Sequence, residues 1–265
     1  LILNDGRNHI LVTAQEYDII SIDATSPKMA GNGSLYTRDF YQLMRDHLSE
    51  DGLAVQWIPY HLLSDAEVRM TVASFLSVFP HASLWFSPLR QNATLIGTMK
   101  ELTIDYEALV EGFQNEVIRE ELAYVNVADP LGFLATFVMG EDALRSYVGG
   151  MRDNTDNHPY LEFTPALAYF VGDLYRLRNL LDFREARESV LPWLVNTGAT
   201  EEEREAVRDA VLRREEAVRL SIDGDVFLVL QEEARAVERY QEALEVDPGE
   251  MNWLNAPARL ERSRR

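Results

Sequence analysis

The first hundred residues alternate between short apolar runs and amphipathic stretches, which is typical of strands connected by helices. The Ile-rich run 17–23 predicts a buried strand, and the runs 53–58, 81–86 and 93–98 predict three more. Residues 37–48 and 64–79 carry apolar side chains at helical spacing. This order predicts a parallel sheet with an antiparallel edge, in which the last two strands form a hairpin around Pro88.

Helix boundaries carry their own signals. Thr37 has the side chain of an N-cap, and Ser64-Asp-Ala-Glu67 matches a capping box. We expect Asp51-Gly52 to end the first helix and Pro80 to end the second. Residues 101–150 predict mainly helix, one of which begins at Asp129-Pro130 and ends at 149–150. Residues 153–159 predict a polar loop, and 160–163 a short extended segment.

The chain from residue 166 onward predicts helices, including a charged one over 201–220. Residues 217–250 match the 34-residue frame of a tetratricopeptide repeat, in which small, aromatic and terminating residues stand at Gly224, Phe227, Ala236, Tyr240, Ala243 and Pro248. An ordinary helical hairpin is the alternative. A single repeat needs neighbours to cover its apolar face, and 169–187 matches weakly as one. Such repeats predict a protein partner.

Composition and charge narrow the function. The 265 residues include no cysteine, which excludes disulfides, thiolate zinc sites and a cysteine nucleophile, and the five histidines have no metal-ligand spacing. A net charge of −19 argues against a nucleic-acid partner. Residues 1–165 carry −13, whereas 166–265 carry −6 and no lysine, which predicts two domains with a boundary near Pro165. The acidic first part suits a cationic substrate, and simple solubility is the alternative.

The chain begins at Leu1 rather than at a methionine, and its first ten residues resemble the interior of a domain. No run approaches the roughly 20 apolar residues of a membrane span. We therefore expect a piece of a longer protein, which would be cytoplasmic or held at the cytoplasmic face of a bacterial inner membrane by a region outside this sequence.

Two carboxylates are candidates for chemistry. Asp23 ends the first strand and precedes a loop with Pro27 and Gly31, and open α/β sheets bind ligands beyond such strand ends. It could accept a proton or hold a cation, or it could cap a turn. Asp5-Gly6 lies before that strand, where a carboxylate beside glycine can accept a hydrogen bond from the exocyclic amine of a heterocycle. A simple turn is the alternative.

A series of segments over residues 1–100 resembles the spermidine synthase (polyamine aminopropyltransferase) family. These segments follow one another in the order found in the family, and they are Asp5-Gly6-Arg7, Tyr17 to Pro27, Leu35 to Tyr41, Gly52 to Trp57, and Phe79-Pro80. Residues 154–163 are similar to a segment of large bacterial spermidine-synthase-like proteins. Those proteins often carry a multi-pass membrane region, and some carry tetratricopeptide repeats.

The resemblance implies an α/β fold. A partial Rossmann-like, methyltransferase-type sheet over 1–165, with its N-terminal half missing, would precede a helical tetratricopeptide-like region over 166–265. It implies aminopropyl transfer from decarboxylated S-adenosylmethionine to a small cationic amine such as putrescine. No cofactor would be bound permanently, and S-adenosylmethionine is the alternative co-substrate.

The resemblance also assigns site residues. It implies Asp23 as the catalytic base and Asp5 as a contact to the adenine of the donor, and we expect Gly6 and Ala24 to contact the donor as well. We also expect contacts to the amine from Ser26, Tyr36 and Gln56. Gln56 ends a strand and could face the site, whereas Tyr36 could line the pocket or staple the helix that follows it. Ser26 stands where the family has a second aspartate, and the family's glycine-rich loop and ribose-binding acidic residue would precede Leu1, so this chain alone is not expected to bind the donor. These departures favour the alternative of a catalytically inactive binding or scaffold module.

Overall fold

The computed structural model describes residues 5–249 apart from 25, 30, 88–89, 91, 126, 128 and 165–167. The chain divides into two compact units whose segments alternate along the sequence. The first comprises Leu1–Trp85, Gln91–Leu102 and Met139–Asn179, and the second comprises Phe86–Arg90, Thr103–Val138 and Leu180–Arg265. The predicted boundary at Pro165 lies outside the described residues, and the division into 1–165 and 166–265 stays a prediction.

The four predicted strands are confirmed as β1 (Tyr17–Ile22), β2 (Leu48–Ile58), β3 (His81–Phe86) and β4 (Ala93–Thr98). Together with β6 (Phe137–Met139) they form one sheet in the order β1-β2-β4-β3-β6. β1 and β2 are parallel, whereas β2 and β4 are antiparallel. The antiparallel strand therefore lies inside the sheet, and the prediction of an antiparallel edge is wrong. Pro88 lies outside the described residues.

β1 is less buried than its composition predicted. Only Ile20 is buried, and Ile19 is 60% exposed. In the described part of the sheet β1 has one neighbour, β2, because it stands at the end of the strand order. Its register with β2 shifts between Tyr17, which pairs with Leu48, and Ile19, which pairs with Leu53. Gly52, expected at a helix end, lies within β2 instead. A strand that is open on one side does not need an apolar residue at every position.

Capping fixes the helices that follow the strands. α2 (Arg38–Asp46) begins where the Thr37 side chain accepts a hydrogen bond from the amide of Phe40. α3 (Asp65–Leu76) begins with the predicted capping box of Ser64 and Glu67. Each helix ends earlier than predicted, because β2 already begins at Leu48 and a turn follows Leu76. The first unit also contains α1 (Gly6–Val12), the short 3-10 segments Gly33–Tyr36 and Tyr60–Leu62, and α7 (Glu141–Val148).

Two predictions in the middle of the chain are wrong. The expected single helix from Asp129-Pro130 to Gly149-Gly150 is two helices, α6 (Pro130–Leu134) and α7, with the buried strand β6 between them. Residues 160–163 form the helical turn α8 (Tyr160–Phe163) rather than an extended segment. α9 (Ala168–Ala186) follows and is kinked at Val171.

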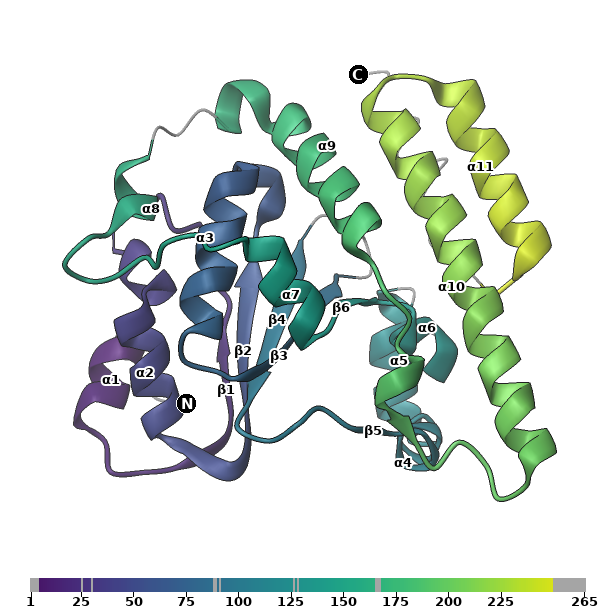
Figure 1. Cartoon of the computed structure of the whole chain (residues 1–265), viewed down its shortest axis with the longest axis horizontal. Coiled ribbons are helices and arrows are strands. Elements are labelled where there is room, and N and C mark those ends of the chain that lie inside the picture. The colour runs from purple at the N-terminus through teal and green to yellow at the C-terminus, as the bar shows by residue number, and fades with distance from the viewer. Residues whose placement is uncertain are drawn as a thin grey trace. The chain divides into compact units, whose positions relative to one another are not determined.

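α2 and α3 lie side by side in the first unit (Figure 1), and aromatic side chains pack them together in its core. The ring centroids of Tyr41 and Phe75 are 5.0 Å apart, and those of Phe75 and Phe79 are 4.7 Å apart. Gly97 of β4 makes room for these rings, because a Cβ atom there would lie 2.6 Å from Phe75. This contact fixes α3 against the sheet and so fixes the residues that follow the end of β2.

The second unit is mainly helical. It contains α4 (Tyr106–Gly112), α5 (Glu116–Tyr124), α6, α10 (Glu201–Val229) and α11 (Glu233–Val246), with a small parallel pair of β5 (Ile104–Asp105) and β7 (Leu194–Val195) and a 3-10 turn, Leu191–Trp193. None of the helices in the described part of the chain is long and apolar enough to cross a membrane.

α10 and α11 lie side by side as a helical hairpin (Figure 1). The two helices approach each other closely at Gly224, because a Cβ atom there would lie 2.6 Å from the ring of Tyr240. The Tyr240 hydroxyl donates to Asp225 at 2.7 Å, and Arg90 forms a buried ion pair with that same carboxylate at 3.0 Å. α11 ends at Val246, just before Pro248. The assignment of this hairpin to a tetratricopeptide repeat stays a prediction.

Candidate functional site

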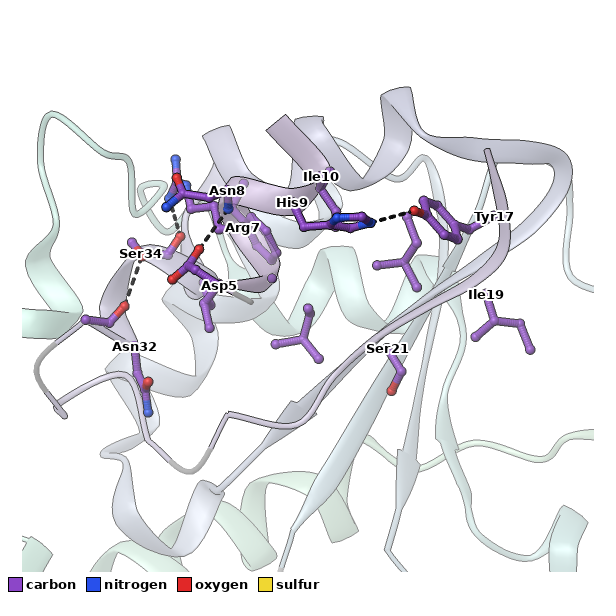
Figure 2. Close-up of a pocket in the computed structure, with 16 residues that line it drawn as sticks. Asp5, Arg7, Asn8, His9, Ile10, Tyr17, Ile19, Ser21, Asn32 and Ser34 are labelled. Carbon is purple, nitrogen blue, oxygen red and sulfur yellow. Dashed lines mark hydrogen bonds between the residues drawn. The ribbon is translucent and has the colours of Figure 1, made fainter. Parts of the chain in front are cut away.

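A cavity of about 770 Å³ lies in the first unit, between α1, β1 and the loop that precedes α2. Figure 2 shows Asp5, Asn32 and Ser34 toward one end and the His9–Tyr17 pair toward the other. Apolar side chains of β1 and α1 complete the wall, among them Ile10, Ile19, Ile20 and Ile22. This volume lies in the range of small-molecule sites, and the mixture of apolar wall and polar ends suits a flat, partly polar ligand.

Asp5 and Gly6 lie at this cavity because of how α1 begins. The Asp5 side chain caps the helix, and its Oδ1 accepts a hydrogen bond from the amide of Asn8 at 2.8 Å. Gly6 is the first helical residue, and a Cβ atom there would meet nothing within 4 Å. A carboxylate has about four lone-pair sites, so a capping aspartate can accept more than one hydrogen bond. Both residues therefore lie in the lining of a ligand-sized space, at the start of a helix that the sequence did not predict.

Asp23 and Ala24 lie where β1 ends, next to the end of β2. The hydroxyl of Tyr36, whose side chain is fully buried, donates to the Ala24 carbonyl at 2.7 Å and lies 3.3 Å from the Trp57 carbonyl. Burial raises the pKa of the Tyr36 hydroxyl well above its ordinary value, and the negative charge of Asp23 adds to that rise. Tyr36 thus stays a neutral hydrogen-bond donor that holds the two strand ends together.

Gln56 of β2 is also buried beside these strand ends. Its Nε2 donates to the Trp57 carbonyl at 3.0 Å, whereas its Oε1 has no hydrogen-bond donor among the described residues. A buried acceptor without a donor costs free energy of about 1–3 kcal/mol. An N–H group brought to this place would therefore be stabilised by Gln56.

Ser26 lies in the loop after β1 and is nearly buried. Its Oγ accepts from the amide of Lys28 at 3.3 Å, and its carbonyl accepts from Met29 at 3.2 Å. The structure thus separates the predicted residues into two groups. Asp5 and Gly6 line the cavity, whereas the other predicted residues lie at the strand ends or in the following loop (Asp23, Ala24, Ser26, Tyr36 and Gln56).

Residues 154–163 contact the segments that precede and form α2 and α3, and the sequence did not predict these contacts. Asn154 is fully buried, its Nδ2 donates to the Tyr36 carbonyl at 3.0 Å, and its amide donates to Ser74 at 2.8 Å. Its Oδ1 accepts from the amide of Leu161, and its carbonyl accepts from the amide of Arg38. The only signal in the sequence was the similarity of 154–163 to large spermidine-synthase-like proteins.

The contacts of Asn154 form a clamp on the segment before α2, and Asp156 extends this clamp to Arg7, which lines the cavity. It forms two hydrogen bonds with Arg7 of α1 and accepts from the Thr37 hydroxyl at 2.8 Å, while its own amide donates to Asp39 at 2.9 Å. Burial by itself would raise the pKa of Asp156, but the hydrogen bonds from Arg7 and Thr37 outweigh it and hold the pKa below its ordinary value. The carboxylate therefore stays ionised and joins α1 to the start of α2.

The fold is α/β, with a methyltransferase-type sheet and a helical C-terminal region. Residues 1–103 match the Spermine/spermidine synthase domain. Curated relatives named polyamine aminopropyltransferase, from Thermotoga petrophila, Thermotoga neapolitana and Thermotoga maritima, are each 36% identical over 53 residues. That stretch is 20% of this chain and 18% of each relative, so the chain spans about a fifth of the relatives it matches.

Proposed function

We propose that this chain contributes to a spermidine-synthase-like transferase that moves an aminopropyl group from decarboxylated S-adenosylmethionine to an amine. One observation carries the proposal. The cavity with Asp5 at its polar end and the strand end with Asp23 both fall within the residues that match the Spermine/spermidine synthase domain. The charge of −13 over residues 1–165 supports it, because an acidic surface attracts a cationic amine and a sulfonium.

The cavity would hold the nucleoside of the aminopropyl donor. The Asp5 carboxylate would accept from the exocyclic amine of the adenine, and the apolar side chains of β1 and α1 would pack on the ring. Gly6 leaves open space toward the cavity, and the main chain at Ala24 would border the ligand where β1 ends. S-adenosylmethionine itself is the alternative co-substrate.

The transfer step would use Asp23 as the base. An amine attacks only when its lone pair is free, so Asp23 takes a proton from the ammonium form. The lone pair then forms a bond to the aminopropyl carbon as the carbon–sulfur bond breaks, and the bonding electrons leave with the sulfur as a neutral thioether. Gln56 Oε1 would accept an N–H of the amine, Tyr36 would hold the strand ends, and Ser26 would bound the acceptor side.

Calorimetry of the full-length natural protein tests the proposal, with decarboxylated S-adenosylmethionine, S-adenosylmethionine and methylthioadenosine as ligands. We expect at least one of them to bind, and we expect Asp23→Asn to keep binding and lose transfer. Asp18→Asn, on the exposed side of the same strand, is the matched control and should keep both. If no ligand binds, the transferase proposal fails and the scaffold alternative remains. If Asp23→Asn turns over normally, Asp23 is not the base.

A further inference from the structure

A buried ion pair joins the loop between β1 and α2 to the first turn of α3. The Nζ atom of Lys28 is 2.8 Å from Oε1 of Glu67, and both side chains are only 7% exposed. The same Nζ lies 5.9 Å from the centre of the Tyr175 ring, which belongs to α9. A carboxylate and an aromatic face are the two groups that recognise a primary ammonium in proteins. The surroundings of Lys28 thus have the composition of an alkylammonium site.

This ion pair lies at the same edge of the sheet as the candidate acceptor residues. Lys28 follows Asp23 by five residues, and Glu67 lies in the first turn of α3, which follows the end of β2. Because β1 and β2 are parallel, the segments after both strands begin at one edge. Ser26 connects the candidate acceptor residues to the ion pair, since its Oγ accepts a hydrogen bond from the amide of Lys28.

The carboxylate of Glu67 is fully engaged. Its Oε2 accepts from the amide of Ser64 at 2.7 Å and from the Ser64 hydroxyl at 2.9 Å, and its Oε1 pairs with Lys28. A second cation could bind this carboxylate only by displacing the Lys28 ammonium. Because a buried carboxylate without a cation is strongly destabilising, the site is selective for one positive charge at a time.

We propose that Glu67 and Tyr175 form a subsite for an alkylammonium ion, that the ammonium group of Lys28 fills this subsite from within the chain, and that Lys28 thereby determines acceptor specificity. The specificity part rests on the proposed transferase function. With this subsite filled, the acceptor is an amine without a second cationic group, because a distal ammonium would find Glu67 already neutralised. Removing the Lys28 side chain leaves a buried site for a free alkylammonium or for the far end of a diamine.

Chemical rescue of stability tests the subsite without any need for activity. Lys28→Ala should lower the melting temperature of the full-length protein by roughly 10 °C. Millimolar propylammonium chloride should restore much of that loss, whereas sodium chloride at equal ionic strength and 1-propanol should not. Lys100→Ala is the matched control, because Lys100 is 55% exposed and pairs with Glu50 and Asp51 at the surface. It should show no specific response to propylammonium.

A second variant keeps the test valid if Lys28→Ala folds poorly. The double variant Lys28→Ala/Glu67→Gln removes both charges and keeps a side chain that can cap α3, so it should be more stable than Lys28→Ala and insensitive to propylammonium. If propylammonium stabilises Lys28→Ala no more than sodium chloride does, or rescues the double variant equally, the proposal is wrong.

The acceptor panel tests specificity. In the wild type, butylamine should be the better acceptor, and Lys28→Ala should lower the KM for putrescine by roughly tenfold and leave that for butylamine unchanged. A wild type that prefers putrescine overturns the specificity part. Rescue by propylammonium in a protein with no transfer activity would keep the subsite and remove the proposed function, whereas activity without rescue would do the reverse.

Discussion

The Nδ2 atom of Asn154 donates a hydrogen bond of 3.0 Å to the carbonyl of Tyr36, a residue 118 positions earlier in the chain. Tyr36 in turn donates to the carbonyl of Ala24. Through these two bonds, a loop residue far along the sequence fixes the segment that follows β1. The candidate site is therefore shaped by a contact that lies outside the residues matching the Spermine/spermidine synthase domain.

Asn154→Ala should destabilise the protein by about 3 kcal/mol, because the Tyr36 carbonyl and the Leu161 amide lose the buried side chain that they bond to. Urea denaturation of the variant and the wild type measures the change. Asn115→Ala is a matched control, since Asn115 caps the exposed helix α5 and should cost only about 1 kcal/mol. Equal losses in the two variants would mean that Asn154 does no more than cap a turn.

Asp156→Asn should lose stability in a pH-dependent way. Hydrogen bonds from Arg7 and Thr37 hold the pKa of Asp156 below its ordinary value of 3.8, so the ionised form is favoured in the folded state. This contribution is present above the pKa of the unfolded chain and is lost as the pH falls through the lower folded pKa. The free-energy difference between wild type and variant should therefore be largest near neutral pH and shrink below about pH 4.

Urea denaturation over a series of pH values measures this difference. The double variant Arg7→Gln/Asp156→Asn should show no further loss of pH dependence than Asp156→Asn, because the two side chains act as one pair. A difference that stays constant from pH 7 to pH 3 would contradict the prediction.

Gly6→Leu should block the cavity and leave the fold intact. Gly6 lines the cavity and a Cβ atom there meets nothing within 4 Å, so a leucine side chain has room at the border of the space that the proposed nucleoside would use. Affinity for methylthioadenosine, measured by calorimetry, should fall by roughly tenfold or more. Gly112→Leu also adds a side chain where a Cβ atom meets nothing within 4 Å, at the end of α4 in the second unit, and it should bind normally because Gly112 does not line the cavity. Normal binding by Gly6→Leu would place the ligand elsewhere.

Gly224→Ala should destabilise the helical hairpin by about 1–3 kcal/mol, although alanine favours helices over glycine. Its methyl group would lie 2.6 Å from the Tyr240 ring, and moving that ring would disturb the hydrogen bond from its hydroxyl to Asp225. Gly112→Ala should change stability by less than about 1 kcal/mol. Thermal denaturation of both variants decides, and a Gly224→Ala variant as stable as the wild type would show that the hairpin adjusts freely.

Local signals predicted much of the fold. Thr37, Ser64 and Glu67 mark helix starts because a capping side chain and the amide it accepts from are only three residues apart. α1 was missed because Asp5-Gly6 reads equally as a turn or as a cap. β6 was missed because a three-residue strand inside an apolar stretch has no periodicity of its own.

The sequence predicted the positions of candidate site residues only where these follow from the order of the strands. Asp23 and Gln56 follow from two adjacent parallel strands, whose ends meet at one edge. The burial of β1 was overestimated, since an Ile-rich run does not reveal whether both sides are covered. The clamp from Asn154 and the pairing of Lys28 with Glu67 join residues that are far apart in sequence, so no local pattern contains them.

The alternating segments of the two compact units affect the order in which the chain can fold during synthesis. The cavity residues leave the ribosome before the segment Met139–Asn179, which the first unit also needs. At about 5–20 residues per second, Asn154 emerges several seconds after Tyr36. During that interval β1 and the loop that follows it are without the contacts from Asn154, so a chaperone that binds nascent chains would meet them in this state.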